Sequence, residues 1–438
     1  MERRVTFYEE TNFKTTEIGE IPEDWEVVKL GEVLDEVKTK NKEGKVLKVY
    51  SVSNIHGFIE SEEFFSKKVY SDDLKPYKVV SKDCFAYNPY RVNVGSIGLF
   101  LEEQPCLVSP AYVVFKIKNK EILLPEFLYL NLKSSKYVSE ISRMAMSRGS
   151  VRQSLSFKDL GLMFLPLPPV EEQKAIAYVL SAVQEAREKT EKVTEATKEL
   201  KKSLMKHLFT YGPVSLEEAS RISLKETEIG EIPADWEVVK LGEVALRMKA
   251  GGTPHTAVKE FWNGDIPFVL IEDMTGQGVF LSKTKRMITQ EGLRNSSAWL
   301  VPANSLLVSM YATIGETAIN LIPVATNQAI IAIVPRENFD VLYGAYFIKY
   351  DSRRLQMQNI QSTQKNVNRA IVENFSIPLP PLSVQKRIAE ILQTVDEKIQ
   401  AEEKKKQALG NLFNSMLHML MSGKLRVKFQ TSEEGASN

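Results

Sequence analysis

The chain has 438 residues, and 57 Lys and Arg against 56 Asp and Glu give it a net charge of +1. A hydrophobic content of 43% and a charged content of 26% are ordinary for a protein of two or more folded domains, and no run of about 18 apolar residues predicts a membrane span. The balanced charge weighs mildly against a nucleic-acid binder, although a local basic surface can be offset by acidic surface elsewhere.

The first predicted element is an opening segment that occurs twice. Residues 16–33 read TEIGEIPEDWEVVKLGEV and residues 227–244 read TEIGEIPADWEVVKLGEV, so that a single position differs. A second pair of similar segments lies about as far apart, LPLPPVEEQKAIAYVL at 165–180 and IPLPPLSVQKRIAEIL at 377–392. The chain is therefore one unit of about 211 residues written twice.

Between the shared segments each copy has a variable stretch of its own, 34–163 in the first copy and 245–376 in the second. Short apolar runs in these stretches predict buried strands, and other runs are typical of helices, so each stretch predicts a mixed fold. The predicted strands are 111–117, 266–271 and 329–334, and the predicted helices are 126–133 and 341–350.

A long polar-apolar run follows each pair of prolines, Pro168-Pro169 and Pro380-Pro381, which suit a helix start. Apolar positions in both runs step by four and three residues, which predicts two helices of about 40 residues with an a/d seam. We expect these helices to pack as an antiparallel coiled coil, with the two copies related by a two-fold axis. The expected seam residues are Val179, Val183, Ala186, Thr190, Val193, Thr197, Leu200 and Leu204 in the first helix and Val395, Ile399, Glu402, Lys406, Leu409, Phe413, Met416 and Leu420 in the second.

Together these elements predict an α/β (α+β) fold class with two pseudo-symmetric globular domains, each followed by a long helix. Gly212 and Gly423 suit the left-handed position after each helix end. Since the opening segment is common to both copies, we expect Trp25 and Trp236 to be core or hinge residues. The expected boundaries are 1–165 and 213–377 for the globular domains, 166–212 and 378–424 for the helices, and 425–438 for a tail.

The sequence resembles the specificity subunit of type I restriction-modification enzymes over nearly its whole length, from about Lys14 to Val427. The resemblance is carried by the doubled opening segment, the doubled PLPPxxxQ, Gly252-Thr253-Pro254 and FWNGDIP at 261–267. It implies two target-recognition domains that each read one half of a bipartite DNA site, and helices that set the spacer and dock two methyltransferase (M) subunits. It also implies that restriction (R) subunits join the full complex, while the chain itself needs no cofactor and catalyses nothing. The first domain lacks Gly-Gly-Thr-Pro and has residues 41–48 instead, which indicates a different recognition-domain subtype.

The motifs of an enzyme are incomplete in this chain. Asn88-Pro89-Tyr90 is similar to the Asn-Pro-Pro-Tyr of adenine methyltransferases, but one proline is missing and no Gly-rich strand-turn-helix precedes it. No Walker-type loop is present, and the four histidines do not cluster at metal-ligand spacings. We therefore expect no catalytic residue and no metal site. Two cysteines and an N-terminus without an apolar secretion segment predict a cytoplasmic protein.

Base readout is expected where the two copies differ, because each copy would read a different half-site. Arg, Lys, Asn, Gln and Ser on loops broken by glycine suit base edges and phosphates. In the first copy the candidate DNA-binding residues are Tyr90, Arg91, Asn93, Ser96, Arg148, Ser150, Arg152 and Gln153. In the second copy they are Ser309, Tyr311, Thr313, Gln361, Ser362, Thr363, Gln364, Lys365 and Asn366.

Several alternatives stay open from the sequence alone. The polar run 361–366 also suits a solvated surface loop, and the basic cluster Lys283, Lys285 and Arg286 suits a solvated face as well as phosphate contacts. The whole chain also fits a specificity subunit of a type II-like restriction-modification assembly, or a coiled-coil scaffold without a DNA role. Copurifying subunits would separate the first of these, and sequence-specific DNA binding with a methyltransferase subunit would exclude the second.

Overall fold

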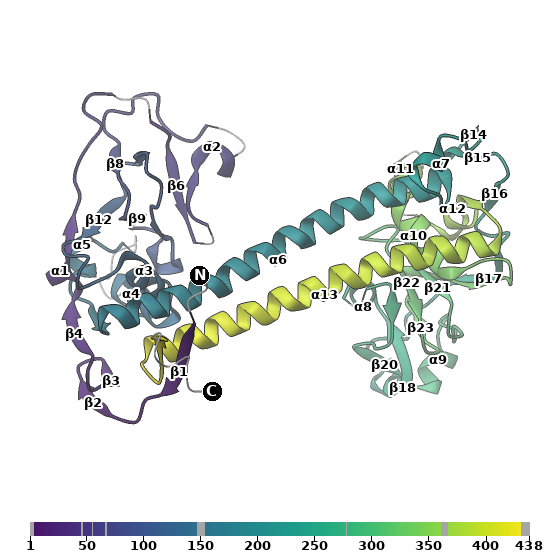
Figure 1. Cartoon of the computed structure of the whole chain (residues 1–438). Coiled ribbons are helices and arrows are strands. Elements are labelled where there is room, and N and C mark those ends of the chain that lie inside the picture. Colours follow the sequence, from purple (N-terminus) through teal and green to yellow (C-terminus); the bar gives the residue numbers. More distant parts are fainter. Residues whose placement is uncertain are drawn as a thin grey trace. The chain divides into compact units, whose positions relative to one another are not determined.

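Two compact units divide the chain in this computed structural model (Figure 1). The first unit comprises Met1–Thr190 and Lys405–Asn438, and the second unit comprises Glu191–Lys404. Each unit thus contains one globular region and part of each long helix, so the sequential boundaries expected between globular domains and helices stay a prediction. Within the described part of the chain, no helix is both long and apolar enough to cross a membrane. The structure describes residues 4–44, 47–54, 56–65, 68–146, 154–276, 278–360 and 367–430.

The first unit is built on a four-stranded antiparallel sheet. Its strands lie in the order β10 (Ile97–Leu99), β9 (Cys84–Tyr87), β12 (Val113–Ile117) and β5 (Leu34–Glu36). Apolar side chains of the central strands form the core, and the rings of β9 and β12 residues stack in it with centroids 4.9 Å apart. The strand predicted from the apolar run at 111–117 is confirmed as β12.

The second unit repeats this strand order. Its sheet runs β22 (Thr317–Asn320), β21 (Leu306–Ser309), β24 (Ile330–Pro335) and β17 (Ala245–Ala250), and β19 (Phe280–Leu281) is added in parallel beside β22. The predicted strand at 329–334 is confirmed as β24. The variable stretches therefore share a sheet topology, although their sequences differ.

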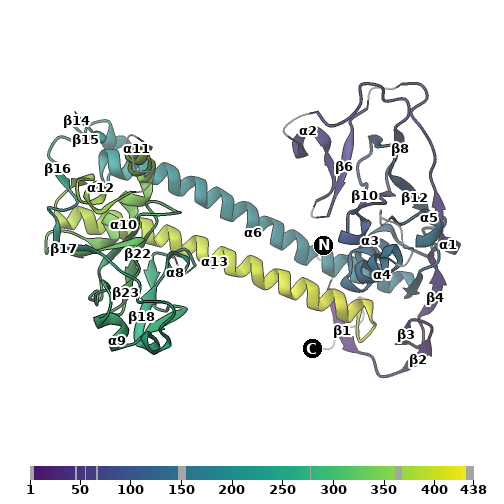
Figure 2. The same cartoon turned by 180° about the vertical axis from the view of Figure 1, so that it is seen from behind.

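Helices that follow each sheet in the chain also correspond. In the first unit α3 (Pro125–Lys133) packs against β10 and is followed by α4 (Ser135–Met146) (Figure 2). In the second unit α10 (Val341–Tyr350) packs against β21 and β22 and is followed by α11 (Ser352–Ile360). The helices predicted at 126–133 and 341–350 are thereby confirmed.

The opening segments hold each unit together around a buried tryptophan. Trp25 is 0% exposed and Trp236 is 3% exposed, so their predicted place in the core is confirmed. The glycines after the helix ends, Gly212 and Gly423, have the predicted left-handed backbone, with φ of +84° and +69°. The strands of these segments are β2 (Phe13–Thr16) paired with β3 (Gly19–Pro22), β4 (Glu26–Lys29) with β13 (Phe164–Leu167), β14 (Leu224–Thr227) with β15 (Gly230–Pro233), and β16 (Glu237–Lys240) with β25 (Ser376–Leu379).

The strand predicted at 266–271 differs in its bounds. It is β18 (Trp262–Val269), and it ends because the Leu270 backbone N–H donates to the Asp273 carboxylate at 2.9 Å, which begins the short helix α8 (Ile271–Thr275). The other small sheets are β18 with β20 (Arg286–Ile288) and β23 (Ala325–Thr326), β6 (Tyr50–Ser53) with β7 (Gly57–Glu60), β8 (Lys78–Val80) with β11 (Cys106–Val108), and β1 (Val5–Glu9) with β26 (Leu425–Phe429). The remaining short helices are α1 (Leu30–Val33), α2 (Ser61–Phe64), η1 (Val92–Val94), α5 (Phe157–Leu160), α7 (Leu216–Ala219), η2 (Lys259–Phe261), α9 (Gln290–Arg294) and α12 (Arg369–Glu373).

The two long helices have the predicted length. α6 (Val170–Tyr211) has 42 residues and α13 (Leu382–Met421) has 40. Within the second unit they run antiparallel, because Lys198 pairs with Glu403 at 3.0 Å and Lys201 pairs with Asp396 at 2.6 Å.

The seam predicted for α6 is partly wrong. Val193 and Leu200 are 44% and 58% exposed, whereas Thr194 and Met205 are buried. The buried side thus lies one residue further along the helix, as expected where a helix of 3.6 residues per turn departs from a strict 3.5-residue repeat. In α13 every predicted seam residue is buried or half-buried, which agrees with the predicted register.

Gly251, at the start of the Gly-Gly-Thr-Pro run, lies against the backbone of β23. A Cβ atom at this position would lie 1.9 Å from the Thr326 carbonyl oxygen. We predict that Gly251→Ala lowers the free energy of unfolding of the second unit by about 1–3 kcal/mol, since a backbone carbonyl in a sheet cannot withdraw freely. Denaturant unfolding measures this, with Gly276→Ala as the control because its nearest neighbour would be 3.5 Å away. Equal losses for both variants would contradict the packing argument.

Candidate nucleic-acid interface

Two loops leave the same place in the two sheets. The first loop, residues 88–96, joins β9 to β10, and the second loop, residues 310–316, joins β21 to β22. Tyr87 faces Ile97 across the first pair of strands, and Val308 faces Thr317 across the second. The candidate residues nearest the sheets therefore lie on topologically equivalent loops, one in each unit.

The first loop exposes part of its predicted set. Tyr90 is 54% exposed, and Arg91 beside it is exposed as well. Asn93 lies in η1, where the structure describes its backbone alone. Ser96 is 5% exposed, so its side chain has no access to a ligand in this structure, because the chain is already entering β10. Tyr90 and Arg91 are the exposed candidates for a base or phosphate contact, and Asn93 stays a candidate.

The candidate residues of the second loop region are likewise partly exposed and partly buried. Thr313 is exposed and Tyr311 is half-buried, but Ser309 is fully buried at the end of β21 and its hydroxyl donates to the Tyr311 carbonyl at 2.8 Å. Ser309 therefore shapes the loop instead of presenting a polar group on its surface. Ala312 has φ of +54°, a left-handed backbone that costs energy for a residue with a Cβ and is found at functional sites.

The second candidate segment of each copy lies outside the described residues. Its flanks, however, contact the loops. Leu155 donates its N–H to the Pro89 carbonyl at 3.2 Å in the first unit, and Gln356 Nε2 donates to the Ile314 carbonyl at 3.1 Å in the second. In each unit the fold thus brings a flank of the second segment to the first. The candidate DNA-binding residues that lie outside the described part of the chain are Arg148, Ser150, Arg152, Gln153, Gln361, Ser362, Thr363, Gln364, Lys365 and Asn366.

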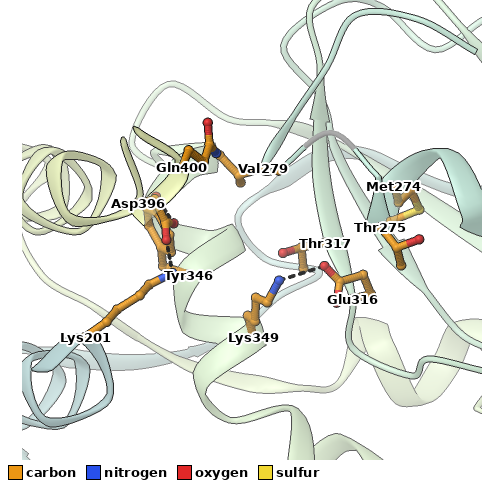
Figure 3. A pocket seen from close by; sticks show the side chains of 11 residues that line it. Lys201, Met274, Thr275, Val279, Glu316, Thr317, Tyr346, Lys349, Asp396 and Gln400 are labelled. Carbon is orange, nitrogen blue, oxygen red and sulfur yellow. Dashed lines mark hydrogen bonds and ion pairs between the residues drawn. The ribbon is translucent and has the colours of Figure 1, made fainter. Parts of the chain in front are cut away.

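Two lysines behind the loops were missed by sequence reasoning. Lys133, at the end of α3, donates to the Gly95 carbonyl at 2.9 Å, and burial lowers the pKa of its ammonium group to about 8. Lys349, near the end of α10, pairs with Glu316 at 2.8 Å (Figure 3). Both side chains line or touch the loop base, and Lys349 and Glu316 also border a small cavity of about 130 Å³. A lysine at the matching place in both copies was the signal that could have identified them.

Two residues of the basic cluster Lys283, Lys285 and Arg286 interact with neighbouring side chains. Lys285 pairs with Glu272 at 2.8 Å, and the Arg286 guanidinium lies 5.8 Å from the centre of the Trp262 ring. Arg286, Trp262 and Asn263 line an open hollow of about 300 Å³. Both interpretations of this cluster from the sequence, a solvated face and a site of phosphate contacts, stay open.

Side chains of the kinds used in metal catalysis are dispersed. Among the residues that the structure describes, no three His, Cys, Asp and Glu side chains gather in a way that could hold a metal ion. His207, near the end of α6, lies with Nε2 2.8 Å from the Val214 carbonyl oxygen. The exposed loop residues Tyr90, Arg91 and Thr313 are of the kinds that contact phosphates and base edges.

Known proteins share the duplicated domain organisation of this chain. Residues 22–198 and 233–411 match the family described as type I restriction modification DNA specificity domain. Two specificity subunits of Methanocaldococcus jannaschii, the putative MjaX and the MjaVIII subunit, are 29% and 28% identical, and each comparison covers 96% of this chain and 98% of the relative. The solved S subunit of a type I system from M. genitalium has 16% identity and a TM-score of 0.57, covering 90% of this chain and 96% of that one. A chain from a solved type I R-M system, studied for complex assembly and conformational transition, has 20% identity and a TM-score of 0.55, covering 92% and 99%.

Proposed function

Because the chain belongs to the type I restriction-modification DNA specificity family, we propose that each of its globular regions reads one half of a bipartite DNA site. The chain is a specificity subunit, and in this proposal it contributes recognition alone. Methyl transfer and cleavage belong to methyltransferase (M) and restriction (R) subunits. The long helices set the spacer between the half-sites and dock two M subunits.

One observation carries the proposal: the two units place different loop residues on the same sheet topology. The strand order β10-β9-β12-β5 returns as β22-β21-β24-β17. The first loop exposes Tyr90 and Arg91 where the second exposes Thr313. A shared frame with different exposed side chains supports two readers of different half-sites, since base edges distinguish side chains by their hydrogen-bonding groups.

We predict that the purified chain alone neither transfers a methyl group to DNA nor cuts it. With M subunits added, it should bind one duplex sequence far more tightly than random duplexes, by about 10³-fold or more. Competition binding at fixed salt measures this, because phosphate contacts make affinity depend on salt. M subunits without the chain are the control. Methyl transfer by the chain alone would contradict its non-catalytic role, and equal affinity for all duplexes would contradict its role in recognition.

A further inference from the structure

Each loop is held at its base by a lysine from the helix that follows the sheet. The Lys133 ammonium donates to the Gly95 carbonyl at 2.9 Å and to the Asn54 side-chain oxygen at 3.2 Å, and it also donates to the Asn54 carbonyl. Asn54 lies in the turn between β6 and β7. Lys133 therefore ties three pieces of chain together, the end of α3, this turn and the first loop.

Lys349 occupies the matching position in the second unit. It comes one residue before the end of α10, and its ammonium lies 2.8 Å from the Glu316 carboxylate at the end of the second loop (Figure 3). The strand registers make Gly95 and Gly315 equivalent, because each lies two residues before the first paired residue of the next strand. Both glycines have left-handed backbone, with φ of +79° and +84°.

Close packing at these glycines leaves the loops little freedom at their bases. A Cβ atom on Gly95 would lie 2.7 Å from the Asn54 side-chain oxygen, which is itself an acceptor of Lys133. A Cβ atom on Gly315 would lie 2.6 Å from the Ser352 Cβ, just beyond α10. In both units the base of the loop thus packs closely against another segment of the chain. A lysine ammonium group also makes a polar contact with the loop there.

We propose that Lys133 and Lys349 are positioning residues that fix the first and second loops in the conformation that reads DNA, each for its own half-site. The inference rests on the proposed function of the two globular regions. Lys133 acts through the loop and not by touching DNA, since its amine is already directed at three oxygen acceptors. The exposed residues that it would position are Tyr90 and Arg91.

The contacts of Lys133 and Lys349 with their loops differ in their expected dependence on pH. Burial lowers the pKa of Lys133 to about 8, so above that pH a neutral amine with two hydrogens must serve three oxygens. Lys349 is half exposed and donates to one acceptor among the described residues, the Glu316 carboxylate, so a single hydrogen is enough for this contact. We therefore expect readout of the half-site assigned to the first loop to weaken as pH rises through about 8, and readout of the other half-site to stay constant.

Titration of Lys133 does not cause such a loss by destabilising the fold. Because the folded pKa of Lys133 is below the free value of 10.5, unfolding takes up a proton between these values, and this group makes the fold more stable as pH rises through that window. Other titratable groups lie on the elements around it. They are His56 in the turn after β6, Arg91 on the loop, Tyr129 on α3, and Lys136 and Glu140 on α4.

The test uses the full chain with its M subunits and a panel of duplexes with single base changes in one half-site at a time. Lys133→Met should reduce discrimination in the first half-site by about tenfold and leave the second unchanged, and Lys349→Met should do the reverse. The matched control is Lys136→Met, an exposed lysine on α4 that should weaken binding to all duplexes equally if it has any effect. Thermal unfolding of each variant confirms that it is folded.

A second measurement keeps the test decisive if Lys133→Met does not fold. The wild-type complex is titrated from about pH 7 to about pH 9.5, beside Lys133→Arg, which keeps its charge throughout, and His56→Gln, which removes the histidine nearest Asn54 in the chain. The wild type and His56→Gln should lose discrimination in one half-site, and Lys133→Arg should not. Wild-type discrimination in the lysine variants, equal loss in both half-sites, or a flat wild-type profile would overturn the inference. A wild-type complex without any sequence preference would instead overturn the proposed function, before any variant is compared.

Discussion

Substituting methionine for Arg426 should lower the free energy of unfolding of the first unit by about 3–5 kcal/mol. Arg426 lies in β26, is 4% exposed, and is shared by three carboxylates. Its guanidinium contacts Glu172 at 2.6 and 2.7 Å, Asp24 at 3.0 and 2.8 Å, and Glu10. Because β26 pairs with β1, this one cation joins both ends of the chain to the opening segment and to the start of α6.

Removal of the cation would leave buried negative charge without compensation. Glu172 is 7% exposed and would keep the Trp25 indole N–H, at 3.0 Å, as a donor. Burial opposes the charged form of Arg426, but hydrogen bonds and attraction to Glu172 and Asp24 outweigh it and raise the pKa of the guanidinium. The charged form is therefore the one that the fold requires.

Denaturant unfolding followed by tryptophan fluorescence measures the effect, because Trp25 lies in the same cluster. Arg353→Met is the control, since Arg353 is an exposed arginine of α11 and should change stability by no more than about 0.5 kcal/mol. The double variant Arg426→Met with Glu172→Gln should recover part of the loss, as expected for coupled charges. Equal stability of the two arginine variants would show that the carboxylates do not need Arg426.

Exchange of one variable stretch should change one half-site completely and leave the other unchanged. We expect a chain in which residues 34–163 come from another specificity subunit with the same sheet order to lose its original first half-site, with affinity falling about 10³-fold or more toward the non-specific level. The reason is that the exposed residues of the first loop lie inside this stretch, whereas those of the second loop lie inside 245–376. Methylation patterns directed by the chimaera and its M subunits measure the outcome.

The chain offers its own control for this exchange. Replacing residues 16–33 with the sequence of 227–244 changes a single residue in a segment that has the same hairpin in both units. This variant should keep both half-sites, because no loop residue is altered. A chimaera that changed both half-sites would contradict the assignment of one half-site to each globular region.

Much of the fold could be predicted because it follows from local pattern. The doubled opening segment, the apolar runs that became β12 and β24, and the helical runs that became α6 and α13 all carry their period in the sequence. The register of α6 could not be predicted, because Val193 and Leu200 are apolar but exposed. Which side of a long helix is buried depends on its partner, and the sequence of one helix does not contain that information.

The candidate interface could be predicted only as a set of segments. Polar residues beside glycines predicted the first and second loops as candidate DNA-binding segments. Ser96 and Ser309, however, are buried where strands begin and end. The lysines behind the loops were missed since nothing near Lys133 in the sequence reveals that Gly95 lies beside it. Comparing the two copies position by position along the matched sheets and helices would have shown a lysine at the same place in both.

The most direct test of the account is methylation mapping of DNA from cells that express this chain with its M subunits. We expect one bipartite motif, with two specified half-sites separated by unspecified bases. The two half-sites should differ from each other, because the two loops expose different residues on the same topology. Methylation at a single continuous motif, or the same motif in cells with the M subunits but without this chain, would contradict the account.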